Sequence, residues 1–443
     1  MEFEVLYLPI GVPTFHLESA QKEFDKSVEL LKRLEPGVKV PNQMLLSIDL
    51  LDKFLESKNP DLVIVQNITF ANGAYIADVL SKVSCPVLLW TLREPLIDGG
   101  RLRLNSLTGA FSASNVLHSF NRPYEYVFGS PLEEEIVTKV RATIEATRVK
   151  KSMKGMNILQ VGHTPQGFGF GRALDAEMLT TFGANLLSIE SRELIDNAKS
   201  YTDEEVKEYL LDASKRIVDL DKIDSKNVKD FARLYKAYDE YTKKNNIKAL
   251  SSRCWPDFFT AFGTPVCAVL ALLNDLNVPS ACEADTYGAL SMYICQYLTK
   301  TPVFFGDPVS LDEKENTITF WHCGTAACSL ARNNKACAGV HCNRKIGPTL
   351  EFGCAPQEAV TIFRVGKDSN GKFRLFIASG KALDKEKQFL GTSIVVQTKN
   401  NSKDIVINAV KRGWEPHFVV AMKDVSEELA ILGNFLGLEV ERY

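Results

Sequence analysis

The chain has 443 residues, of which 45% are hydrophobic and 24% charged, and its formal net charge is −3. This length allows two or three domains, and the composition is that of an ordinary globular protein, which excludes a disordered or coiled-coil chain. Lysine and arginine are spread among acidic residues without a basic block, so nucleic-acid binding is not indicated. No apolar run approaches the roughly 18 residues that cross a bilayer.

The chain starts on an acidic segment. Met1-Glu-Phe-Glu-Val-Leu-Tyr predicts a first strand and lacks the basic and then apolar layout of a signal peptide. We therefore expect a cytoplasmic protein with no membrane contact.

The first 150 residues alternate strand and helix patterns. Apolar runs at Val5–Leu8, Leu62–Val65 and Pro86–Trp90 predict strands, and the amphipathic stretch Ala20–Leu34 predicts a helix. Such alternation predicts a parallel sheet covered by helices. The charged segment Val149–Gly155 follows, and we place a domain boundary in it, after residue 152.

The next region repeats the alternation of strands and helices. The predicted strands are Asn157–Val161, Ile247–Leu250, Val278–Ala281 and Val303–Phe305, and the predicted helices include Pro265–Leu273 and Ala284–Leu298. This pattern predicts a second doubly wound unit over residues 153–308.

From about Thr317 onward the pattern becomes that of β-structure. The predicted strands are Thr317–Trp321, Val360–Val365, Phe373–Ala378 and Ile394–Gln397, with a hairpin turn at Asp368–Gly371. The sequence thus predicts an α/β fold with two Rossmann-like doubly wound domains, residues 1–152 and 153–308, followed by a β-rich, barrel-like C-terminal domain, residues 309–443.

Polar residues follow three predicted strands of the middle domain. Arg253 and Trp255 come after the strand at 247–250, Glu283 after the strand at 278–281, and Asp307 after the strand at 303–305. If these strands are parallel and joined by right-handed crossovers, the four side chains meet at the carboxyl edge of one sheet, where α/β sheets bind ligands. Two adjacent carboxylates repel, and a divalent cation between them removes the conflict.

His322 ends the next predicted strand. An imidazole and two carboxylates suit a cation such as Mn²⁺. Each residue also has a structural alternative. Glu283 or Asp285 could cap the following helix, Asp307 could belong to a turn, and His322 could pack beside Trp321.

The ten cysteines fall into two groups with one outlier. Cys254, Cys267, Cys282 and Cys295 lie in apolar contexts typical of free buried thiols. Five more lie from Cys323 to Cys354, among them two Cys-x4-Cys pairs, close to His322 and His341. Zinc sites commonly use Cys-x2-Cys pairs, so a structural zinc site is not expected here.

Together, these motifs resemble the metal-binding core of L-fucose isomerases and their relatives, including L-arabinose isomerases. The resemblance lies in Arg253-Cys-Trp255-Pro, Ala281-Cys-Glu283-Ala-Asp285-x-x-Gly288-Ala-Leu-Ser-Met292, Val303-Phe-Phe-Gly-Asp307 and His322-Cys-Gly324. It implies an aldose–ketose isomerase dependent on Mn²⁺ or another divalent cation, acting on a monosaccharide. It also implies a homo-oligomer, often a hexamer, with active sites at subunit interfaces.

By this resemblance, Glu283 and Asp307 are both metal ligands and acid/base groups, and His322 is the third ligand. The two carboxylates would move a proton between C2 and C1 of the open-chain sugar through a cis-enediol. The arabinose branch has a second histidine ligand late in the chain. The comparable segment here, Ala378–Lys381, has no histidine, which favours a three-ligand site.

The candidate substrate contacts are Arg253, Trp255 and two residues of the loop Gly162–Gly171, His163 and Gln166. Arg253 could bind an anionic substituent such as phosphate or sulfonate, or could neutralise the carboxylates. Two alternative functions stay open at this point. One is a metal-dependent sugar hydrolase or lyase, and the other is a non-catalytic sugar-binding protein.

Overall fold

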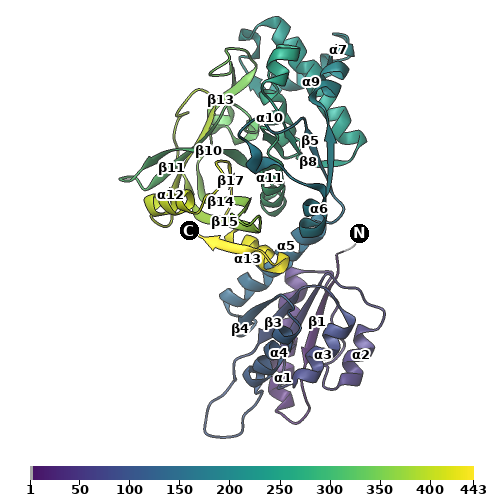
Figure 1. Ribbon diagram of the computed structural model, residues 1–443. Helices are drawn as coiled ribbons and strands as arrows, with labels where there is room; N and C mark the ends of the chain where they lie inside the picture. Colours follow the sequence, from purple (N-terminus) through teal and green to yellow (C-terminus); the bar gives the residue numbers. More distant parts are fainter. Residues whose placement is uncertain (1–2) are drawn as a thin grey trace. The chain divides into compact units, whose positions relative to one another are not determined.

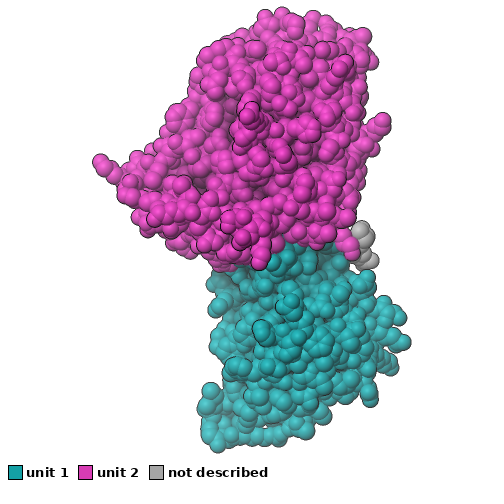
Figure 2. Space-filling model, in the orientation of Figure 1, with its two compact units in different colours: residues 1–152, 427–437 teal, residues 153–426, 438–443 magenta. Residues whose placement is uncertain are grey.

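The computed structural model describes residues 3–443 (Figure 1). The chain divides into two compact units, residues 1–152 with 427–437 and residues 153–426 with 438–443 (Figure 2). The predicted boundary at residue 308 lies inside the second unit, and the division into three domains stays a prediction. No helix within residues 3–443 is long and apolar enough to cross a membrane.

The first unit is a parallel sheet with helices on both faces. In spatial order its strands are β1 (Val5–Ile10), β2 (Leu62–Asn67), β3 (Val87–Thr91) and β4 (Tyr124–Phe128). The helices are α1 (Leu17–Leu34), α2 (Ile48–Leu55), α3 (Gly73–Lys82), α4 (Ser106–Ser119), α5 (Glu134–Met153) and α13 (Ser426–Leu436). Successive strand residues face opposite sides, so Leu6 packs in the core with α3 and Tyr7 in the core with α1. The predicted helix-covered parallel sheet is confirmed.

The second unit contains another parallel sheet. Its strands are, in spatial order, β6 (Asn185–Ile189), β5 (Asn157–Val161), β8 (Ile247–Ser252) and β9 (Ser280–Cys282). The helices of this part are α6 (Asp175–Glu177), α7 (Ser191–Ser200), α8 (Lys207–Arg216), α9 (Ser225–Lys244), α10 (Cys267–Asp275) and α11 (Thr286–Thr299). The apolar α10 and α11 are almost entirely buried, so they lie between this sheet and the rest of the unit.

A mixed ten-stranded sheet makes up the rest of the second unit. Its order is β18 (Glu439–Arg442), β15 (Phe373–Ala382), β14 (Gln357–Lys367), β17 (Phe418–Ala421), β10 (Phe304–Asp312), β11 (Thr317–His322), β16 (Thr392–Thr398), β13 (Thr349–Gly353), β12 (Ala336–Gly339) and β7 (Ile217–Val218). An additional pairing joins β15 to β16. One helix, α12 (Ser402–Lys411), follows β16. The predicted hairpin between β14 and β15 is confirmed.

The sequence prediction placed the strand that carries Asp307 in the wrong sheet. β10 pairs antiparallel with β11 and with β17 in the mixed sheet, and it is not a strand of the parallel sheet β6-β5-β8-β9. The cause is local. β10 runs on to Asp312 and turns directly into β11 through Asn316, whose φ of 54° suits a tight turn. Asp307 therefore reaches the site from a different sheet than Glu283.

Candidate active site

Glu283 lies in a tight turn between β9 and α11. Glu283 and Ala284 both have left-handed backbone angles, with φ of 57° and 53°. Such angles are unfavourable for residues with a side chain and persist only where the surroundings enforce them. Here the Ala284 N–H donates to the Ser252 carbonyl at 3.0 Å, and Asp285 caps α11 by accepting from the Gly288 N–H at 2.8 Å. Asp285 is thus the helix cap, and Glu283 is left free to face the mixed sheet.

Three neighbouring strands of the mixed sheet present Asp307, His322 and His417 together. Gly306 on β10 pairs with Phe418 on β17, and Asp307 pairs with Trp321 on β11. His417 and His322, each next to a paired residue, therefore lie on either side of β10. His417 Nε2 is 2.9 Å from Glu283 Oε2 and 3.4 Å from Asp307 Oδ1, and His322 Nε2 is 3.7 Å from Glu283 Oε2.

A buried ion pair orients His417 from behind. Asp285 Oδ2 is 2.9 Å from His417 Nδ1, and Asp285 accepts two hydrogen bonds from Arg364 at 2.6 and 3.0 Å. Arg364 is 0% exposed and Asp285 1% exposed, so the pair is shielded from water. A carboxylate on Nδ1 holds a ring proton there, so that Nε2, once its own proton is displaced, directs a lone pair at Glu283 and Asp307. This is the second-layer arrangement that metal-binding histidines commonly show.

The two ring nitrogens of His322 have the opposite hydrogen-bonding roles to those of His417. Its Nδ1 accepts the backbone N–H of Cys323 at 3.0 Å. A neutral imidazole that accepts on Nδ1 carries its proton on Nε2. The Nε2–H of His322 therefore faces Glu283 Oε2 at 3.7 Å, an electrostatic contact longer than a hydrogen bond.

The pKa values of the two carboxyl groups of the site shift in opposite directions. Burial alone would raise the pKa of Glu283, but the adjacent imidazoles of His322 and His417 outweigh it and lower that pKa to about 2. Burial raises the pKa of Asp307 above its usual value, although both histidines oppose the shift. Burial would lower the pKa of His417, but hydrogen bonds with Asp285 and Glu283 raise it to about 9. Two carboxyl groups with different proton affinities thus flank one imidazole.

Aromatic side chains form a wall beside this cluster. Trp255 Nε1 donates to Glu283 Oε1 at 3.3 Å, and the Phe168 ring packs edge-on against Trp255 at 5.9 Å. Phe170 packs against the ring of His417 at 5.3 Å. The loop at 162–171 therefore borders the site, as expected, but through its phenylalanines.

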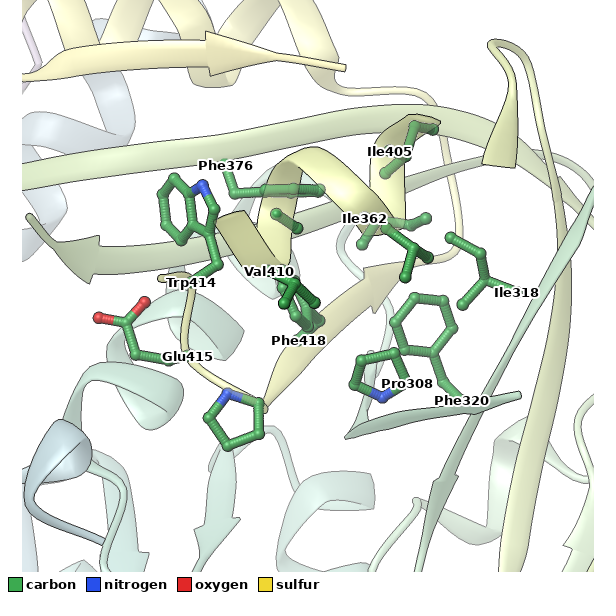
Figure 3. A pocket seen from close by; sticks show the side chains of 13 residues that line it. Pro308, Ile318, Phe320, Ile362, Phe376, Ile405, Val410, Trp414, Glu415 and Phe418 are labelled. Atoms are coloured by element: carbon green, nitrogen blue, oxygen red, sulfur yellow. The ribbon is translucent and has the colours of Figure 1, made fainter. Parts of the chain in front are cut away.

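An apolar cavity of this unit is not lined by Glu283, Asp307, His322 or His417. It has a volume of about 250 Å³ and is lined by side chains such as Ile318, Ile362 and Phe376, as Figure 3 shows. Pro308 and Pro416 also line it, although each is adjacent in sequence to a residue of the cluster. Its lining offers a sugar little hydrogen bonding.

Comparison with known proteins identifies the family. The chain is 59% identical over 444 residues to a sulfoquinovose isomerase of Clostridium sp. (strain MSTE9), covering 100% of this chain and 99% of the relative. It is 38% identical to a sulfoquinovose isomerase of Priestia megaterium and 37% identical to one of Alkalicoccus urumqiensis, again over at least 98% of each chain. The chain belongs to the sulfoquinovose isomerase family. No family model matches it.

Membership of this isomerase family makes the chain an enzyme and sets aside the reading as a non-catalytic sugar-binding protein. The resemblance to L-fucose and L-arabinose isomerases agrees with the family in reaction class, a sugar isomerase. The narrower relationship to those two enzymes stays a prediction.

The structure brings together some, but not all, of the residues predicted for the site. Arg253 lies at the same edge as Trp255, 25% exposed, with Nε 3.5 Å from Asp257. His163 and Gln166 are exposed, and the His163 ring faces Glu190 at 3.7 Å. The roles of all four as substrate contacts stay predictions.

Sequence reasoning missed two residues of the cluster, His417 and Arg364. His417 precedes the buried strand β17, and Arg364 interrupts the apolar run of β14. A charged residue inside a buried strand is rare unless it is paired, so Arg364 did carry a signal. A second histidine does lie beside Glu283 and Asp307, but it is His417, from a segment other than Ala378–Lys381; the three-ligand site stays a prediction.

Proposed function

We propose that this enzyme is an aldose–ketose isomerase that uses Mn²⁺ or a similar divalent cation and acts on sulfoquinovose, a hexose with a sulfonate at C6. The family relationship over the full chain supports the substrate. The convergence of Glu283 and Asp307 on one nitrogen of His417, at 2.9 and 3.4 Å, supports the chemistry.

Glu283, Asp307 and His417 are the residues we propose to hold the cation. Two carboxylate oxygens and an imidazole nitrogen form the mixed oxygen and nitrogen donor set that suits Mn²⁺. Asp285 keeps the Nε2 lone pair of His417 available on the side of the carboxylates. His322, the third ligand predicted from sequence, forms with Glu283 and His417 a group whose possible ligand atoms all lie within 4.8 Å of one another, so we propose it as a further ligand. Asp307 joins this group through its 3.4 Å approach to His417 Nε2.

The reaction moves a carbonyl from C1 to C2 of the open-chain sugar. A bound divalent cation supplies Lewis-acid stabilisation of the oxygens at C1 and C2. One of the two carboxylates, Glu283 or Asp307, takes the proton from C2 and returns it at C1, with a cis-enediol between the two steps. The other carboxyl group transfers the proton between O1 and O2, and the groups exchange roles in the reverse direction. In the unloaded site Glu283 holds its proton less tightly than an ordinary glutamate, and Asp307 holds its proton more tightly than an ordinary aspartate.

Arg253 is the proposed partner of the sulfonate. Its guanidinium lies at the same edge of the parallel sheet as Trp255, and a guanidinium matches the planar, multidentate recognition of an oxyanion. A charge-assisted hydrogen bond contributes about 1.5–3 kcal/mol. Arg253→Gln should therefore raise KM for sulfoquinovose by roughly ten- to a hundred-fold. An uncharged aldose should show no such change, and an equal rise for both sugars would remove Arg253 from this role.

Site-directed variants and metal depletion test the chemistry. Glu283→Gln and Asp307→Asn should each abolish turnover of sulfoquinovose followed by NMR, whereas Glu313→Gln, at an exposed turn, should not. Treatment with EDTA should remove activity, and added Mn²⁺ should restore it. Full activity in either site variant would rule out this mechanism. Hydrolysis or cleavage of the sugar in place of ketose formation would instead favour a hydrolase or lyase.

A homo-oligomer, possibly hexameric in analogy to the L-fucose isomerases, and a cytoplasmic location are also part of this proposal. Exposed apolar side chains of the first unit support association. Leu107, Phe111 and Tyr126 are 45%, 71% and 42% exposed and line one hollow, and contiguous exposed apolar surface is typical of interfaces. Size-exclusion chromatography with light scattering measures the state directly, and Phe111→Lys should shift it toward monomer.

A further inference from the structure

An exposed arginine lies over the aromatic wall of the candidate active site. Arg344 belongs to the loop 340–348, which joins the antiparallel strands β12 and β13. Its guanidinium carbon lies 5.4 Å from the centre of the Trp255 ring and 5.0 Å from that of the Phe259 ring, an arrangement in which the ring faces attract the cation. Within residues 3–443, no carboxylate pairs with the Arg344 side chain and no protein group accepts a hydrogen bond from it.

The buried side chain of His341 holds the loop in place. Its Nδ1 accepts the backbone N–H of Arg344 at 3.4 Å, and its ring packs edge-on against Phe259 at 5.1 Å. The His341 carbonyl accepts the backbone N–H of Lys345 at 2.8 Å. The backbone of Arg344 is therefore fixed relative to the aromatic rings that its guanidinium covers.

Trp255 connects Arg344 to the carboxylates of the site. Its Nε1–H donates to Glu283 Oε1 at 3.3 Å, and its ring lies under the Arg344 guanidinium. A sugar whose C1 and C2 lie at Glu283 and Asp307 extends its C6 away from them. The indole is comparable in length with an open chain from C2 to C6. A sugar that lies along Trp255 therefore brings its C6 substituent toward the guanidinium of Arg344.

Arg253 and Arg344 differ in how much of their hydrogen-bonding capacity is free. Arg253 Nε is 3.5 Å from Asp257 Oδ1 and donates to the Trp255 carbonyl at 3.4 Å, so one of its donors is already engaged. The guanidinium donors of Arg344 have no protein acceptor within residues 3–443 and are open to an oxyanion. A sulfonate is a strongly hydrated anion, and an exposed partner can bind it without removing all of its water.

We propose that Arg344 is a specificity-determining residue, which binds the sulfonate at C6 together with Arg253. This inference rests on the proposed function and adds to it a second cationic contact, from a different part of the second unit. The sulfonate is remote from C1 and C2, so its interaction with Arg344 is the same in the bound substrate and in the transition state. Loss of such an interaction raises KM and leaves kcat unchanged.

Kinetics of full-length variants with two sugars test the role of Arg344. One sugar is sulfoquinovose, and the other is the 6-deoxyhexose that lacks only the sulfonate, measured by its KM or, if it binds without turnover, by its Ki. Arg344→Gln should raise KM for sulfoquinovose about five- to ten-fold at unchanged kcat, and Arg344→Glu should raise it further. Neither variant should change the constant for the 6-deoxyhexose. Lys345→Gln removes the adjacent exposed cation and, as the matched control, should keep the parental KM for both sugars.

Two outcomes overturn this inference alone. The first is a parental KM for sulfoquinovose in Arg344→Gln. The second is an equal rise for both sugars, because Arg344 would then only support its loop or Trp255. In both cases the parent enzyme still isomerises sulfoquinovose, so the proposed function stands. A parent protein that neither binds sulfoquinovose in calorimetry nor isomerises it overturns the proposed function, and this inference with it.

Discussion

Asp285→Asn separates three roles that one carboxylate fulfils in this structure. Asp285 caps α11, pairs with the buried Arg364 and holds the Nδ1 proton of His417. Asparagine is as good a helix cap as aspartate, so the cap is preserved. The negative charge is lost, and Arg364 is left charged and unpaired at 0% exposure. Removing one partner of a buried ion pair costs about 3–5 kcal/mol of unfolding free energy.

The same substitution should reverse the orientation of the His417 ring proton. With its amide oxygen turned to Arg364, the asparagine presents an N–H group to His417 Nδ1, which then accepts. The ring proton moves to Nε2, where it blocks the lone pair that faces Glu283 and Asp307. Loss of such a supporting partner typically weakens metal binding by about 10–100-fold, or about 1.4–2.7 kcal/mol.

Calorimetric titration with Mn²⁺ and thermal unfolding without metal distinguish the two effects. Adding Arg364→Met to Asp285→Asn removes the unpaired charge, so it should recover much of the stability. It should not recover Mn²⁺ affinity, because Nδ1 of His417 still lacks its carboxylate. Asp285→Asn with parental Mn²⁺ affinity would refute the reasoning about the ring proton.

Four further outcomes follow from the site. Because the pKa of His417 is about 9 against 6.5 for a free histidine, Mn²⁺ affinity measured by calorimetry should rise about ten-fold per pH unit up to about pH 9, where the ion no longer displaces a proton. The same raised pKa stabilises the metal-free protein below pH 6.5, and thermal melts should show that this contribution is lost as pH rises through 9. Gly171→Ala places a Cβ 2.8 Å from the Cα of Asp285, so it should cost about 1–3 kcal/mol in denaturant unfolding and weaken Mn²⁺ binding. Trp255→Phe removes the 3.3 Å hydrogen bond to Glu283 and should cost about 1 kcal/mol of unfolding free energy. It should also shift the acidic limb of the plot of kcat/KM against pH to higher pH. An unshifted plot would show that this bond does not act on Glu283.

The sequence predicted the two carboxylates because their signals are local. Glu283 follows a short buried strand and Asp307 lies at the end of an apolar run, so each stands out from its neighbours. The strands and helices of the first unit could likewise be recognised in the sequence, since helix-covered parallel strands are continuous apolar runs. Burial and secondary structure could thus be predicted from neighbouring residues.

Contacts that depend on strand pairing could not be predicted from neighbouring residues. The run at 303–305 is equally apolar in a parallel or an antiparallel strand, and only its pairing with β17 decides between them. That pairing also delivers His417, which comes from a segment far along the chain. Arg364 has the same origin, because its contact with Asp285 joins two elements that no local pattern connects.

The first unit includes a segment from near the end of the chain, so it cannot be completed until that segment has been synthesised. Residues 427–437 belong to this unit, although the chain builds all of residues 153–426 before them. Once made, α13 lies beside α5, where Lys139 contacts Glu427 at 2.8 Å, and Asn434 donates to the Tyr124 carbonyl at 3.0 Å (Figure 1). The unit that leaves the ribosome first therefore waits for nearly the whole polypeptide before its last helix arrives. A fragment ending at residue 152 would expose the surface that this helix covers.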